Sequence, residues 1–106
     1  MSDDNESKEH ALTLLDLKHL EDARATAEAK LSEYQSNLDS EQAMLDGLLA
    51  EPETTNNEQY LMLAKKACRS GIYAWVCDIE DLKHEIDMYT AKINTRLARI
   101  ATGEMQ

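Results

Sequence analysis

This sequence of 106 residues contains no phenylalanine, one proline and three glycines. Because proline and glycine interrupt regular structure and mark turns, their scarcity leaves few points where the chain can change direction. The strand-forming residues are scattered and do not alternate with polar ones, which argues against a sheet. Hydrophobic residues make up 42% of the chain and charged residues 30%. This balance favours a folded helical protein over a disordered one, so we predict an all-α fold.

Long runs of uncharged apolar residues are also missing, which argues against a membrane-spanning helix. The start of the chain, MSDDNESKEH, is acidic and polar and lacks the basic and apolar regions of a signal peptide. The only two cysteines, Cys68 and Cys77, would lie roughly 13 Å apart on one helix. That separation is too large for a disulfide between them. We therefore expect a cytoplasmic protein with reduced thiols.

Positive charge is scarce relative to negative charge. The chain has 11 Lys and Arg against 21 Asp and Glu, for a net charge of −10, and no Lys or Arg lies between Leu31 and Ala64. A surface that binds nucleic acid needs clustered cations for the phosphates, so we expect no direct nucleic-acid binding. This region instead predicts an acidic surface, formed by Asp39, Asp46, Glu51, Glu53 and Glu58.

Apolar residues recur alternately three and four positions apart over residues 68–100, with Arg96 as the break. This seam comprises Cys68, Ile72, Trp75, Ile79, Leu82, Ile86, Tyr89, Ile93 and Ile100. Such spacing predicts a long amphipathic helix that packs along another helix. A second seam, with Arg24 and Glu41 at core-type positions, comprises Leu17, Leu20, Ala27, Leu31, Tyr34, Leu38, Leu45 and Leu48.

The segment EPETTNN, residues 51–57, separates the two seams and contains the only proline. We predict a disordered acidic tail over residues 1–6 and a single helical-hairpin domain over residues 7–106. Its helices are expected at about 8–50 and 58–102. Two long helices joined by a short loop form an antiparallel hairpin, which could dimerise into a four-helix bundle.

Local signals refine this hairpin. Thr55 and Glu58 have the spacing of a capping box, and Gly103 is expected to end the second helix. Gly71 lies inside that helix and is expected to mark a close approach of the two helices, with a helix break as the alternative. An antiparallel register with its turn near residue 55 places Tyr34 opposite Trp75.

The same register brings charged residues together across the hairpin. It places Arg96 in the region of Asp16 and would let Glu41 reach Lys65. Exposed ion pairs of this kind contribute up to about 1 kcal/mol each, so they set the register more than the stability.

Some apolar residues lie off the seams. The candidate partner-binding residues are Tyr60, Leu63, Tyr73, Ala74 and Cys77 near the loop, with Leu12 and Leu15 at the other end. Apolar residues on more than one face of a helix indicate contact with something else. Three explanations are open: a homodimer, the binding of a different protein, and a third helix that folds back locally.

The sequence offers little that could carry catalysis or bind a metal. It has no Gly-rich phosphate loop, GxSxG or CxxC motif. The one Asp-x-x-His element, Asp81 with His84, lies off the seam, and a single carboxylate–histidine pair is not a metal site. Cys68 is too far from His84 along the helix to form a nucleophile–base pair. We therefore expect no enzymatic activity, no cofactor and no metal.

These features predict a non-enzymatic protein-binding module, such as an adaptor, chaperone or inhibitor, that acts through an exposed apolar face and an acidic surface. The alternative is an acidic mimic of nucleic acid that inhibits a DNA-binding or nuclease complex, as a phage-type anti-defence or regulatory protein would. A further, weaker alternative is an acidic hairpin tip that enters a channel and holds a metal ion there.

Overall fold

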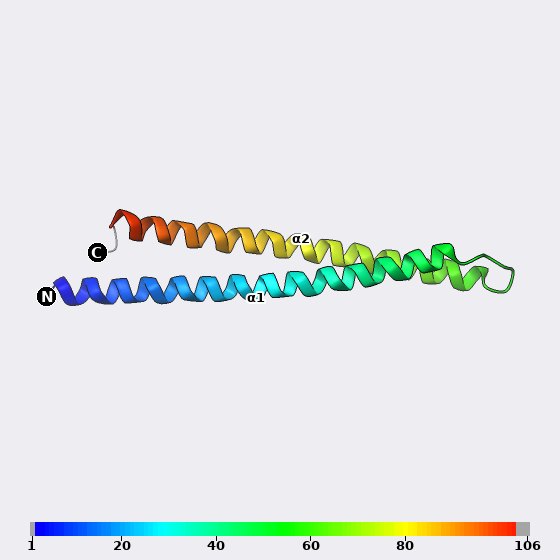
Figure 1. Cartoon of the computed structure of the whole chain (residues 1–106), viewed down its shortest axis with the longest axis horizontal. Helices are drawn as coiled ribbons and strands as arrows, with labels where there is room; N and C mark the ends of the chain where they lie inside the picture. The colour runs from blue at the N-terminus through cyan, green and yellow to red at the C-terminus, as the bar shows by residue number, and fades with distance from the viewer. Residues whose placement is uncertain (1, 104–106) are drawn as a thin grey trace. The chain divides into compact units, whose positions relative to one another are not determined.

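The computed structural model describes the backbone of residues 2–103 and the side chains of Ala11 and of residues 13–103. It is a helical hairpin of two long helices, α1 (Ser2–Ala50) and α2 (Glu58–Thr102), shown in Figure 1. The described residues contain no strand and no third helix, and the predicted all-α hairpin is confirmed. Within that range, neither helix has a stretch that is apolar and long enough to span a bilayer.

The helix boundaries follow the sequence signals closely except at the N-terminus. α1 begins at Ser2 and not near Lys8, so residues 2–6 belong to the helix where we expected a disordered tail. This segment lacks glycine and proline, the residues that most disfavour a helix interior. α1 ends at Ala50, and α2 begins at Glu58.

The chain divides into two compact units, each made from one stretch of α1 and one of α2. The first unit comprises Met1–Ala29 and Lys83–Gln106, and the second comprises Lys30–Leu82. The second unit therefore contains the loop between the helices. We describe each unit separately.

In the first unit, polar side chains accompany the apolar core. Ala27, Ile93 and Thr13 are buried. Arg96 Nε donates a hydrogen bond of 2.6 Å to Asp16 Oδ2, which confirms the predicted proximity of these two residues. Together with the contact of Arg24 with Thr90, this hydrogen bond shows an antiparallel arrangement in this unit, because residue numbers rise along α1 as they fall along α2.

Arg24 provides a second polar contact between the helices of the first unit. Its Nη1 donates to Thr90 Oγ1 at 3.4 Å, and its Nε lies 3.5 Å from Glu28 Oε1. Arginine can occupy a core-type position in this way because its long apolar stem packs in the seam while the guanidinium reaches polar groups at the edge.

The core of the second unit follows the predicted seams. Leu45, Leu61, Cys68, Ile79 and Leu82 are buried. Tyr34 and Trp75 lie opposite each other, as the register predicted. Their ring centroids are 5.1 Å apart and their ring planes are inclined at 56°, a tilted geometry that aromatic pairs favour. Leu61 is completely buried and extends the α2 seam one heptad beyond its predicted start at Cys68.

The loop is organised by Asn57 and not by the expected Thr55–Glu58 capping box. The Asn57 side chain accepts a hydrogen bond from the Thr54 backbone N–H at 2.7 Å and donates one to the Pro52 carbonyl at 3.2 Å. Asparagine can tie both sides of a loop because its amide is both acceptor and donor. At the other end of α2, Gly103 has a φ of 78° and ends the helix as predicted.

Candidate functional site

The predicted partner-binding residues on α2 are exposed. The exposed fraction is 64% for Tyr60, 54% for Leu63 and 73% for Tyr73, and Ala74 and Cys77 are also exposed. Leu15 on α1 is 50% exposed, whereas the side chain of Leu12 lies outside the described residues. Large apolar side chains therefore remain open to solvent in the second unit, where a partner could cover them.

These residues do not share one face of α2. Successive residues of a helix are rotated by about 100°, so Tyr60 and Tyr73 lie about 140° apart around the axis, on opposite sides of the seam. Ala74 and Leu63 lie on the side of Tyr60, and Cys77 points away from the seam. We call the side that carries Tyr60 the groove flank, because a groove between the two helices opens on that side.

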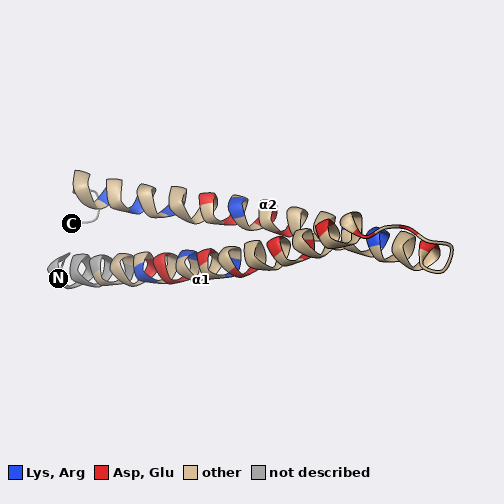
Figure 2. Cartoon of the chain, turned by 45° about the vertical axis from the view of Figure 1, so that its right-hand side comes forward, with Lys and Arg blue, Asp and Glu red and all other residues tan. Residues whose placement is uncertain are grey.

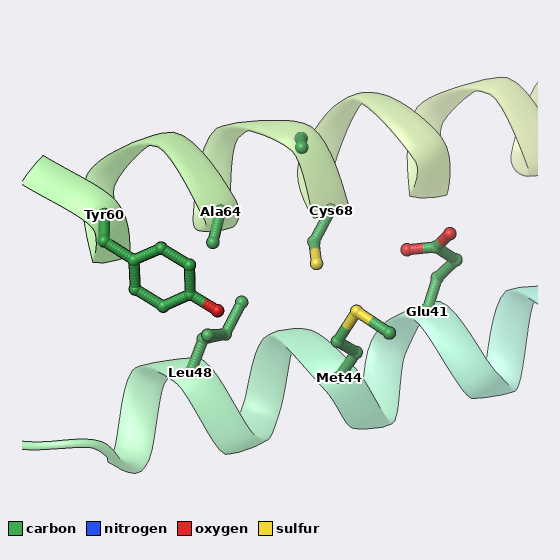
Figure 3. Close-up of a pocket in the computed structure, with 7 residues that line it drawn as sticks. Glu41, Met44, Leu48, Tyr60, Ala64 and Cys68 are labelled. Atoms are coloured by element: carbon green, nitrogen blue, oxygen red, sulfur yellow. The ribbon is translucent and has the colours of Figure 1, made fainter.

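An apolar groove of about 320 Å³ runs between the two helices on the groove flank of the second unit. Its walls are formed by Glu41, Met44 and Leu48 of α1 and by Tyr60, Ala64, Ala67 and Cys68 of α2. In Figure 3 the Tyr60 ring leans across toward Leu48, while the Glu41 carboxylate lies at the opposite end of this first hollow. The small side chains of α2 leave this space open because they do not fill the gap opposite Met44.

A second hollow of about 250 Å³ adjoins the groove and shares Glu41 and Met44 with it. Its other lining residues are Asn37, Ser40 and Trp75. The two hollows together extend from Tyr60 to Trp75, or about four turns of α2. We use the term groove for both. Sequence reasoning did not find it, although Ala64 and Ala67 beside the seam were the signal for it.

Glu41 lies at the midpoint of this groove and close to the backbone of α2. A Cβ atom built on Gly71 would lie 3.2 Å from the Glu41 Cδ atom, so the end of the Glu41 side chain lies against this glycine. α2 continues through Gly71 unbroken, so the alternative of a helix break is wrong. The expected contact between Glu41 and Lys65 is not formed, because Lys65 Nζ lies 3.4 Å from Glu53 Oε1 in the loop. Among the described residues, the half-buried Glu41 carboxylate has no basic partner within ion-pair distance.

The predicted acidic surface is exposed throughout, at Asp39, Asp46, Glu51, Glu53 and Glu58. Figure 2 shows acidic residues, without basic ones, along the loop-proximal part of α1. Two of the five carboxylates have partners: Asp46 accepts a hydrogen bond from Gln42 Nε2 at 3.2 Å, and Glu53 pairs with Lys65. The Gln42 amide is neutral, so Asp46 keeps its charge, and of these five carboxylates only Glu53 has a cationic partner.

In the part of the chain that the structure describes, no group of three or more His, Cys, Asp or Glu side chains is placed to hold a metal ion. Cys68 is buried at the floor of the groove, and Cys77 is exposed. Comparison with protein-family models, curated proteins and solved structures gives no significant match to this chain. A functional assignment therefore rests on the surface of the second unit.

Proposed function

We propose that this chain is a non-enzymatic protein-binding module, an adaptor, chaperone or inhibitor, that contacts its partner through the second unit. The observation that carries this proposal is the exposure of large apolar side chains on α2, above all Tyr73 at 73% and Tyr60 at 64%. Burying apolar surface contributes about 25 cal/mol per Å². Exposed tyrosines on a rigid helix are therefore a source of binding free energy, and tyrosine is enriched at protein interfaces.

The architecture supports the same proposal. A hairpin buries one stripe of each helix, and the flanks of both helices stay in contact with water unless another chain covers them. In the second unit these flanks also carry Met44 and Met62, each 59% exposed. Methionine side chains are flexible and adapt to the shape of a partner. The groove offers apolar walls and one carboxylate, a combination suited to holding a side chain.

A second candidate function is an acidic mimic of nucleic acid. It is favoured by the seven acidic residues and the absence of any base between Leu31 and Glu58. Against it, Lys65, Lys66 and Arg69 lie in the same unit, and Lys65 already neutralises Glu53. Affinity of a mimic for its target comes almost entirely from charge and falls steeply with salt, whereas an interface with buried apolar side chains keeps part of its affinity at high salt. Binding that persists at high salt therefore favours the protein-binding module.

The test is recovery of partners with the affinity-tagged chain from its native cell, followed by mass spectrometry. The variant Leu63→Gln with Tyr73→Gln removes two exposed apolar side chains from the second unit. The control, Met88→Gln with Leu97→Gln, removes two from the first unit, where they are 43% and 45% exposed. We expect the first variant to lose the partner and the control to retain it, with far-ultraviolet circular dichroism unchanged in both.

Two results would contradict the proposal. Equal retention of partners by both variants would show that the exposed residues of the second unit do not bind them. Sedimentation could instead give twice the 12.0 kDa mass of one chain. If that larger mass disappeared in the Leu63→Gln, Tyr73→Gln variant, the surface would serve self-association.

A further inference from the structure

We infer that the groove of the second unit receives a basic amphipathic helix of another protein, which lies along the groove from Tyr60 to Trp75. This inference rests on the proposed function and names the class of partner that fits it. Bound there, the helix would complete a local three-helix arrangement with α1 and α2. The shape of the groove, its charge and the placement of its polar groups each favour such a partner.

The shape of the groove suits a helix. Its two hollows, about 320 and 250 Å³, meet at Met44 and Glu41 and follow about four turns of α2. An amphipathic helix of that length would insert apolar side chains spaced three and four residues apart. Ala64 and Ala67 on the α2 wall are small, so they permit the close axial distance of packed helices, about 8–10 Å. Met44 on the opposite wall can adjust to the inserted side chains.

The charge of the groove flank is negative. Glu41 is the only charged residue of the lining. By helical rotation, Glu33 lies on the same side of α1 as Met44, and Asp78 lies on the same side of α2 as Tyr60, beyond Trp75. Both carboxylates are exposed.

The bases of the second unit lie away from this groove. Lys65, Lys66 and Arg69 lie on the other side of α2. Lys30 lies one turn of α1 beyond Glu33, farther from Met44 than Glu33 is, and it balances one of the three carboxylates of this flank. A basic partner therefore meets a complementary field here. A second copy of the chain would place acidic groove against acidic groove, at a net charge of −10 for each copy.

The polar groups lie where an incoming helix would need them. The Glu41 carboxylate is half-buried, faces the groove and has no basic partner among the described residues. A Lys or Arg of the bound helix could form a charge-assisted hydrogen bond with it in partly desolvated surroundings. At the other end, the mostly exposed Tyr60 ring offers an apolar face and a hydroxyl to the rim of the interface.

The probe is a synthetic helical peptide of about 18 residues, long enough to cover the groove. It carries leucines on one face and Lys and Arg beside them, without tryptophan. One comparison peptide replaces the bases with Glu, and another scrambles the sequence so that the leucines surround the helix. Trp75 lines the groove and is the only tryptophan of the chain, so its fluorescence reports occupancy. We expect saturable binding of the basic amphipathic peptide, at least about tenfold tighter than binding of either comparison.

Two protein variants localise the binding. Ala67→Arg fills the groove, and Ala43→Arg places the same side chain on the face of α1 directed away from α2, where Ala43 is exposed. Both variants add one positive charge, so a difference in their peptide affinities cannot come from the net charge of the protein. We expect Ala67→Arg to weaken binding at least about tenfold and Ala43→Arg to leave it within about twofold. Glu41→Gln should lower the affinity for the basic peptide by about threefold to tenfold.

The inference is overturned if the basic peptide does not bind saturably, if the acidic or scrambled peptide binds equally well, or if the two arginine variants behave alike. Its failure is distinguishable from failure of the proposed function. If a native partner is still lost from the Leu63→Gln, Tyr73→Gln variant while the peptide fails, the groove assignment is wrong and the protein-binding function stands. If recovery of the native partner is unchanged by both sets of variants, both proposals fail.

Discussion

Replacing Gly71 with alanine tests the contact between the α2 backbone and Glu41 of α1. A methyl group at this position would lie 3.2 Å from Glu41 Cδ and 3.3 and 3.4 Å from its two carboxylate oxygens. The first two distances are shorter than ordinary van der Waals contact, and the third is at its lower limit. The carboxylate, however, lies at the end of a flexible side chain that is only half-buried. It can move by a few tenths of an ångström, and the cost of that movement decides the effect of the substitution.

Two opposing contributions set the magnitude. Alanine is favoured over glycine in a helix interior by about 1 kcal/mol. Displacing the Glu41 side chain from its preferred rotamer costs about 0.5–1.5 kcal/mol. The free energy of unfolding of Gly71→Ala should therefore rise by no more than about 0.5 kcal/mol, the difference between these two terms. In a Glu41→Ala background the opposing contact is removed, and the same substitution should gain the full amount of about 1 kcal/mol.

The assay is a double-mutant cycle on urea unfolding followed by far-ultraviolet circular dichroism. The cycle should give a coupling energy between positions 41 and 71 of about 0.5–1.5 kcal/mol, the rotamer cost that Glu41→Ala removes. Gly47→Ala is the matched control, because a Cβ at Gly47 meets nothing within 4 Å. Its effect should be the same with Glu41 and with Ala at position 41, to within about 0.3–0.5 kcal/mol.

Two results would refute this reasoning. Equal gains from Gly71→Ala in the two backgrounds would mean that the Glu41 carboxylate does not approach the α2 backbone. A loss of more than about 1 kcal/mol from Gly71→Ala alone would mean that the carboxylate is fixed in place. The second result would also weaken the inference that Glu41 is available to a bound helix.

Leu61→Ala should cost about 2–5 kcal/mol of unfolding free energy, because Leu61 is completely buried. Leu63→Ala, at a position that is 54% exposed, should stay within about 0.5 kcal/mol, and equal costs in urea unfolding would show that the seam does not include Leu61. The Tyr89 hydroxyl donates a hydrogen bond of 3.2 Å to the Glu85 carboxylate, and this bond, with burial and the Glu85 charge, raises the pKa of Tyr89 above 10.0. Glu85→Gln should lower that pKa toward its ordinary value in an NMR titration of carbon-labelled tyrosine, and an unchanged titration would contradict the contact.

Much of the fold was predictable because heptad spacing encodes it directly. The pairing of Tyr34 with Trp75 followed from the seams and the length of the loop alone. Leu61 was missed because the polar Lys65 occupies the next core-type position and hides the continuation of the pattern. The role of Asn57 in the loop was not predicted, because Thr55 and Glu58 have the spacing of a capping box and that motif was assigned to the start of α2 instead.

The candidate site was predictable only in part. The exposure of Tyr60 and Tyr73 followed from their positions off the seam. Their division between two sides of α2 was already implicit in the rotation of a helix, and a helical projection could have found it. The groove itself was hidden, because its walls come from residues that are distant in sequence, such as Met44 and Ala67.

The sequence by itself determined the helices, the faces they bury and the negative charge of the chain. It could do so because hydrophobic burial imposes the period of the helix on the residues and because charge is a sum over residues. Only the tertiary structure decided that one flank of the second unit is hollow and that Glu41 lies against Gly71 beside it. The volume left between two helices depends on which side chains meet across them and in which rotamers, and no single segment of sequence specifies that.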